Sequence, residues 1–167
     1  NLTRGKTQWN CLAQQVMMMS LDRRRYADEK ESIYNMDTWA AYRVPRDRLL
    51  AKMRGLDNVV VLTGDEHQNY AGVLESGDKP VAVEFVSTSI SSGGDGSDLR
   101  AGSDMLLRDN SQLKFINDQR GYLVCDVTPD AWTTQFRVMD RVSSAGGSIA
   151  TRASITVPHG QPSLTIA

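Results

Sequence analysis

The apolar positions in the first part of the chain predict a helix. From Thr7 to about Leu21, apolar residues recur every three or four positions behind Thr7 as an N-cap, as on an amphipathic helix. The run Met17–Met19 fits a helix that packs on a sheet. A polar, charge-rich stretch follows as far as Asp37 and predicts a loop. The recurring apolar positions are Trp9, Leu12, Ala13, Val16 and Met19.

The next stretch predicts a second helix and then a buried strand. The helix is expected to begin near Trp39, to restart at Pro45 and to end at Gly55, because glycine often follows the last turn of a helix. Val59 to Leu62 form an unbroken run of mostly β-branched residues, which ends at Thr63 and Gly64. Such a run is typical of a strand that is buried on both faces.

The rest of the chain predicts strands joined by turns. Val81 to Val86 reads as a strand, a Ser/Gly-rich loop runs from Thr88 to Asp98, and a helical turn is expected from Ser103 to Leu107. We therefore expect an α+β fold that is antiparallel and β-rich toward the C-terminus. The later strands are expected at Leu113 to Ile116, Gly121 to Val127, Ala131 to Met139 and Ser148 to Val157.

Composition indicates a folded globular chain and excludes several function classes. The 167 residues are 40% hydrophobic and 23% charged, close to average globular proteins. The net charge of -1 gives no overall field for nucleic acid or an anionic membrane, so we expect no nucleic-acid partner. No apolar stretch reaches the roughly 18 residues that span a bilayer, so no membrane span is expected.

Two local features are expected to have no chemical role. Arg23–Arg25 precede Asp28, Glu29 and Glu31, so this run reads as a self-compensating surface rather than a binding patch. The two cysteines, Cys11 and Cys125, are too few for a disulfide scaffold and are expected to be buried free thiols.

The candidate site follows the buried strand. Gly64 allows a close turn, after which Asp65 and His67 emerge together where the strand ends. Asp offers a hard oxygen ligand, and His offers a nitrogen ligand, a general acid or a donor to phosphate. The alternative is that Asp65 caps the next segment and His67 is an ordinary loop histidine. The chain has two histidines, so it cannot assemble a three-histidine zinc centre.

Other chemistries fit less well. A serine triad could use Asp65 and His67 with Ser87, Ser89 or Ser91, but no Gly-x-Ser-x-Gly elbow is present. The segment from Gly93 to Asp98 partly resembles a calcium-binding nonapeptide, but it occurs once instead of in an array. We expect that segment to be a loop that borders a site.

Several motifs, in order across essentially the whole chain, resemble the C-terminal half of PhoD-like phosphatases. The Gly-Asp-x-His and Phe-Val-x-Thr-Ser-Ile pieces are the most specific of them. The motifs are Gln8-Trp9, Leu12-Ala13-Gln14-Gln15-Val16, Asp37-x-Trp39-x-x-Tyr42, Arg48-Leu49-Leu50, Leu62-Thr63-Gly64-Asp65-x-His67, Glu84-Phe85-Val86-x-Thr88-Ser89-Ile90, Arg120-Gly121-Tyr122 and Val127-Thr128-Pro129.

The resemblance implies part of a four-layer αββα metallophosphoesterase sandwich, in which metals are held at strand ends. Members are secreted or periplasmic enzymes that hydrolyse phosphomonoesters and phosphodiesters with iron and calcium. By this resemblance Asp65 is a metal ligand. His67 is a second metal ligand or a catalytic contact to the substrate phosphate. Thr88 and Ser89 lie on a loop near the substrate.

The resemblance also implies that the site is incomplete. The family's other ligands come from N-terminal motifs that this sequence lacks. Residues 1–167 are therefore expected to be the C-terminal portion of a single metallophosphoesterase domain, with the N-terminal half as partner, and to be inactive when isolated. The alternative function is a non-catalytic β-rich binding or assembly module that keeps the framework without a working metal centre.

Overall fold

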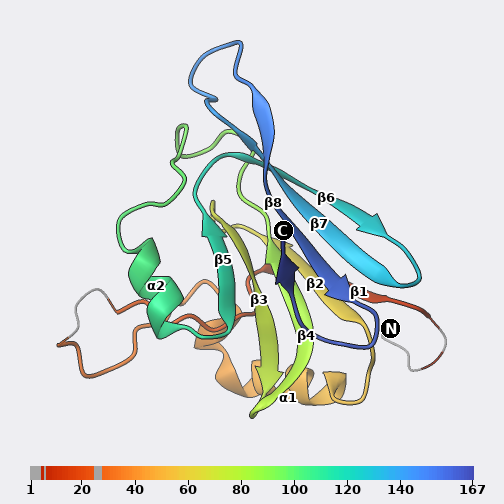
Figure 1. Ribbon diagram of the computed structural model, residues 1–167. Coiled ribbons are helices and arrows are strands. Elements are labelled where there is room, and N and C mark those ends of the chain that lie inside the picture. The colour runs from red at the N-terminus through yellow and green to blue at the C-terminus, as the bar shows by residue number, and fades with distance from the viewer. Residues whose placement is uncertain (1–4, 6, 25–27) are drawn as a thin grey trace.

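The computed structural model describes residues 5, 7–24 and 28–167. Within them, nine strands form a mixed sheet, ordered β1-β2-β4-β3-β5, and an antiparallel sheet, ordered β6-β7-β8-β9. Figure 1 shows α1 below the mixed sheet, α2 beside β5, and the antiparallel strands together at the other side. The elements are β1 (Asn10–Val16), η1 (Trp39–Ala41, a 3-10 helix), α1 (Arg43–Met53), β2 (Val59–Gly64), β3 (Asn69–Ser76), β4 (Lys79–Val86), α2 (Ser103–Asp109), β5 (Leu113–Asn117), β6 (Gly121–Val127), β7 (Ala131–Met139), β8 (Ile149–Pro158) and β9 (Thr165–Ile166).

Strand direction in the mixed sheet determines where the candidate site lies. β1 and β4 both pair with β2 in parallel, while β3 pairs antiparallel with β4 and β5. The carboxyl ends of β2 and β4 therefore meet at one edge of the sheet. The Ser87 N–H donates to the Thr63 carbonyl at 2.9 Å, which joins the segments that leave the two strands. Ligands of open sheets bind outside such an edge.

Two apolar clusters cover the two faces of the mixed sheet. One contains Leu50 and Met53 of α1 together with Val59 and Val61 of β2. The other lies between the two sheets and is centred on aromatic rings. There the fully buried Phe136 ring lies 4.6 Å from Phe115 and 6.2 Å from Phe85, measured between ring centroids. The inter-sheet cluster consists of Val60, Ala71, Val83, Phe85, Phe115, Trp132, Phe136, Ala153, Ile155 and Val157.

Most of the predicted elements are confirmed. The second helix, the strands at Val59 and Val81, the helical turn at Ser103 and the four later strands all form. The C-terminal part is antiparallel, as expected of the predicted α+β fold. The described residues supply helices, a mixed sheet and an antiparallel sheet; the four-layer αββα arrangement stays a prediction.

The helix predicted from Thr7 to Leu21 is wrong. The residues of β1 pair in parallel with β2, from Asn10 opposite Val59 to Val16 opposite Gly64. Cys11, Ala13 and Gln15 are exposed and the residues between them are less so, which is the alternation of a strand. Asn10 and Gln14 are polar although they occupy two of the more buried positions, so the apolar residues of this segment do not show the two-residue period of a strand.

A buried carboxylate fixes the segment that follows β1. Glu84, in the centre of β4, accepts hydrogen bonds from the backbone N–H groups of Met18 (2.7 Å) and Met19 (2.6 Å). It also accepts one from the Thr63 hydroxyl of β2 at 3.1 Å. Burial raises the pKa of Glu84 to about 7, although these hydrogen bonds and the nearby Arg46 favour the charged form.

This carboxylate makes stability depend on pH. The pKa of Glu84 in the folded state, about 7, lies above its ordinary value of 4.5. The folded chain therefore binds more protons between these values, and stability falls as pH rises through this window, by on the order of 3 kcal/mol. Urea unfolding between pH 5 and 8 should show this slope, and E84Q should flatten it. Equal slopes in both proteins would exclude Glu84 as the source.

Candidate functional site

The turn after β2 presents Asp65 and His67 to solvent. Both residues adopt left-handed backbone angles, with φ of 71° at Asp65 and 53° at His67. Both are exposed, and within the described ranges neither side chain has a hydrogen-bond or ion-pair partner. Residues other than glycine adopt this conformation at a cost, and such residues cluster at functional sites. The sequence-predicted pair therefore lies at a strand end, and neither side chain is paired with another described residue.

Glu66, between these two residues, points into the protein instead. Its carboxylate accepts from Arg23 Nη2 at 2.5 Å and from Asn35 Nδ2 at 3.1 Å. The Glu66 side chain is 5% exposed, so this pair is largely shielded from water. The middle residue of the turn thus anchors it, while the residues on either side remain free to bind a ligand.

Arg23 and Arg24 each pair with a carboxylate. Arg23 pairs with Glu66, far away in sequence, and Arg24 pairs with Asp22 at 2.8 Å. Of the acidic residues that follow the run, Glu29 accepts a hydrogen bond from Arg24 Nη1 through its backbone carbonyl at 3.3 Å. Arg25 lies outside the described residues.

Arg120 joins the turn to the loop that follows β4. It is 3% exposed, and its Nη1 donates to the His67 carbonyl (2.5 Å), the Thr88 hydroxyl (3.1 Å) and the Ser89 hydroxyl (3.4 Å). Its Nη2 donates to the carbonyl of Asp118 at 2.6 Å. One guanidinium therefore connects three loops and brings Thr88 and Ser89 beside His67. Sequence reasoning missed this role, since Arg120 was noted there only as part of a motif.

Buried amides hold the same loops from beneath. Asn69 Oδ1 accepts from the Thr88 N–H at 3.1 Å, and its Nδ2 donates to Asn117 Oδ1 at 3.0 Å. Asn69 and Asn117 are both almost completely buried. Buried polar groups that are satisfied in this way restrict the conformation of the chain around them. The loop that carries Thr88 and Ser89 is thus fixed relative to the turn with Asp65 and His67.

The side chains of Asp65 and His67 are of types that bind metals, but they form only part of a complete set of metal ligands. No group of three or more His, Cys, Asp and Glu side chains in the described part of the chain could hold a metal ion. Asp65 and His67 offer one carboxylate and one imidazole, both exposed and unpaired. These are donors that calcium and iron accept, and they would form a corner of a larger ligand set.

The cysteines and the second histidine lie elsewhere. Cys11 is exposed, which corrects the expectation that it is buried, and Cys125 is half-buried; both are free thiols. Although Cys11 is exposed, the protein around its sulfur removes part of its water, and this partial desolvation, followed by the neighbouring Cys125, raises the pKa of the thiol. His159 is exposed, as expected, and its ring lies 6.0 Å from that of Trp9.

Comparison with known proteins identifies the family of this chain. The profile of the PhoD-like phosphatase family matches residues 1–136. The chain belongs to this family, whose enzymes are in general metal-dependent.

Two relatives show how much of the family's fold is present. The chain is 40% identical to alkaline phosphatase D of Bacillus subtilis (strain 168) over 171 residues, which cover 98% of this chain and 29% of the relative. The solved structure "Structure of PhoD" superposes with a TM-score of 0.88 at 40% identity, covering 96% of this chain and 31% of that one. The chain thus spans less than a third of either relative. No helix among the described residues combines the length and the apolar character needed to cross a membrane.

Proposed function

We propose that this chain supplies part of the metal site of an enzyme that hydrolyses phosphomonoesters or phosphodiesters. The observation that carries the proposal is the turn after β2, where Asp65 and His67 are exposed and unpaired on a left-handed backbone. A carboxylate and an imidazole held ready in this way fit metal ligands better than they fit a cap or an ordinary loop histidine. Membership of the PhoD-like family supports the reaction class.

Each residue has a distinct role in this proposal. Asp65 would be a metal ligand, since its exposed carboxylate offers the hard oxygen atoms that such cations prefer. His67 is a second ligand or donates a hydrogen bond to the phosphate as a catalytic residue. Asp65 and His67 would hold metals, calcium and iron by family resemblance, and these would supply polarisation of the phosphoryl oxygens and activation of a water. Arg120 keeps the His67 carbonyl in place and so orients the imidazole.

Thr88 and Ser89 border the substrate in this proposal. The Thr88 hydroxyl is buried and accepts from Arg120, which favours a positioning role. The Ser89 hydroxyl is less buried and donates to the Ser92 carbonyl at 2.6 Å. Ser89 is therefore the better candidate of the two for contact with a phosphate ester.

The rest of the site belongs to another part of the protein in this proposal. Two ligands are too few for a centre with two metals, and the chain spans 29% of alkaline phosphatase D of Bacillus subtilis. We take residues 1–167 as the C-terminal portion of a single metallophosphoesterase domain that pairs with the N-terminal half and is inactive without it. Family resemblance also supports a secreted or periplasmic location.

Metal analysis and metal removal test the function. The full-length protein should contain calcium and iron by elemental analysis and should hydrolyse p-nitrophenyl phosphate or its bis ester. Removal of the metal with a chelator should reduce hydrolysis by at least a hundredfold, and addition of the metals should restore it. A folded, metal-free protein without hydrolytic activity would support the non-catalytic binding or assembly module instead.

A further inference from the structure

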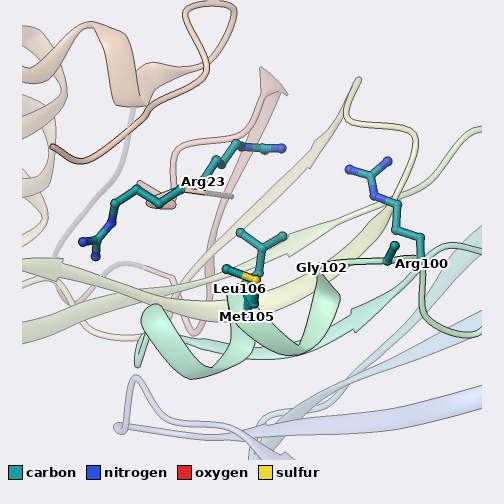
Figure 2. A pocket seen from close by; sticks show the side chains of 7 residues that line it. Arg23, Arg100, Gly102, Met105 and Leu106 are labelled. Carbon is teal, nitrogen blue, oxygen red and sulfur yellow. The ribbon is translucent and has the colours of Figure 1, made fainter. Parts of the chain in front are cut away.

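A pocket of about 600 Å³ lies between the segment that follows β1 and the start of α2. Three arginines, Arg23, Arg24 and Arg100, contribute to its lining, and Met105 and Leu106 of α2 add apolar side chains. Figure 2 shows Arg23 and Arg100 on opposite sides of the pocket, with Met105 and Leu106 below them on α2. The size is within the usual range for small-ligand sites.

The charges of this arginine pocket are not balanced. Arg23 pairs with Glu66, and Arg24 pairs with Asp22. Arg100 is exposed, and its guanidinium makes no ion pair or hydrogen bond with any residue that the structure describes. Three cations with two carboxylate partners leave one positive charge for a ligand. Guanidinium groups bind phosphate through paired hydrogen bonds, and their planar faces tolerate apolar neighbours.

The pocket is connected to the turn that carries the candidate metal ligands Asp65 and His67. Glu66, which binds Arg23, is the residue between Asp65 and His67. The charges of Arg23 and Arg100 both act on the phenol of Tyr70, which donates a hydrogen bond to Gln68. Burial is the larger influence on that phenol and raises the pKa of Tyr70 to about 12, so it stays neutral. The pair of Arg23 with Glu66 therefore joins the lining of the pocket to the turn that carries Asp65 and His67.

We propose that the arginine pocket binds a second phosphate of the substrate, next to the phosphoryl group that reacts. The proposal rests on the proposed phosphoesterase function and narrows its substrate class to esters with more than one phosphate. Arg100 binds this second phosphate directly. The pair of Arg23 with Glu66 holds the pocket against the turn.

Binding of inorganic phosphate tests the pocket apart from catalysis. The full-length D65N protein lacks the carboxylate of one candidate metal ligand, and calorimetry should still detect phosphate binding to it. Adding R100A should weaken this binding at least tenfold. R48A is the matched control, because Arg48 is an exposed arginine on α1 outside this pocket, and it should bind as before. Binding that is absent, or equal with and without R100A, would overturn the subsite.

Kinetics then separate the subsite from the proposed function. In the otherwise unaltered protein, R100A should raise KM about tenfold more for a dinucleotide with a terminal phosphate than for the same dinucleotide without it. Equal changes in KM for the two substrates would contradict the subsite. Phosphate binding that depends on Arg100, in a protein that hydrolyses neither substrate, would keep the anion site and reject the phosphoesterase.

Discussion

Full-length D65N is expected to lose bound metal and about a thousandfold in hydrolysis. A metal centre stabilises the transition state by several kcal/mol, and each 1.4 kcal/mol or so corresponds to a factor of ten in rate. Asparagine keeps the size of Asp65 but loses its charge. It also tolerates the φ of 71° at this position, whereas most other residues would add backbone strain. The measurements are elemental analysis and kcat/KM for p-nitrophenyl phosphate.

The matched control for D65N is D130N. Asp130 is an exposed aspartate in the turn between β6 and β7, so its replacement should change neither metal content nor rate. H67N complements the test, because asparagine again suits a left-handed backbone. If His67 is a ligand, metal content falls with the rate; if it contacts only the phosphate, the rate falls while the metal stays. D65N with normal metal content and rate would reject Asp65 as a ligand.

Replacing Arg120 with methionine is expected to destabilise the fold by about 3 to 5 kcal/mol. The guanidinium is almost completely buried and donates to oxygens of His67, Thr88 and Asp118. It also lies 3.3 Å from the carboxylate of Asp118, measured from Nη2 to Oδ1. Methionine would leave these acceptors without a donor in a place that water reaches poorly. Urea denaturation gives the change in the free energy of unfolding.

R152M and R120K serve as control variants for the destabilisation expected of R120M. Arg152 pairs with Asp98 on the surface, where both side chains are substantially exposed, so its loss should change stability by less than about 1 kcal/mol. R120K keeps the charge but not the planar fork, so it should lie between wild type and R120M in stability. If Arg120 also positions His67, folded R120K should bind metal about 10- to 100-fold more weakly. Unchanged metal affinity would leave Arg120 a purely structural role.

The sequence pattern identified elements whose own residues determine them. The buried strand β2 and the regularly alternating β7 were predicted because their apolar periods are unbroken. The helix predicted over β1 was wrong because the conformation of this segment depends on parallel pairing with β2, far along the chain. Helical spacing is a weak signal when such tertiary contacts compete with it.

β3 was missed for a different reason. A glycine in its middle reads as a strand breaker, but Gly72 is needed there because a Cβ would lie 2.6 Å from both Met19 Sδ and the Gln112 carbonyl oxygen. The glycine accommodates a methionine that crosses the strand, a contact that no local pattern reports. The two-residue β9 was missed as well, being too short to show a period.

The candidate site also combines residues that the sequence pattern identifies with residues whose role depends on the tertiary fold. Asp65 and His67 could be named as candidates because their residue types and their place after a buried strand are visible in the sequence. Arg120 and Glu66 could not, since their importance comes from contacts with His67 and Arg23, which are remote in sequence. Local spacing indicates ligand atoms, whereas the groups that hold them depend on the tertiary fold.

The parallel pairing of β1 with β2 also bears on the order of folding. β6 and β7 are joined by a short turn, so they can pair early, at Val127 and Trp132. β1 reaches β2 only after a long loop closes to bring Asn10 opposite Val59. Closing such a loop costs entropy before any contact offsets it, and it slows folding. The strand that leads into Asp65 is therefore expected to gain its β1 neighbour later than β6 gains β7.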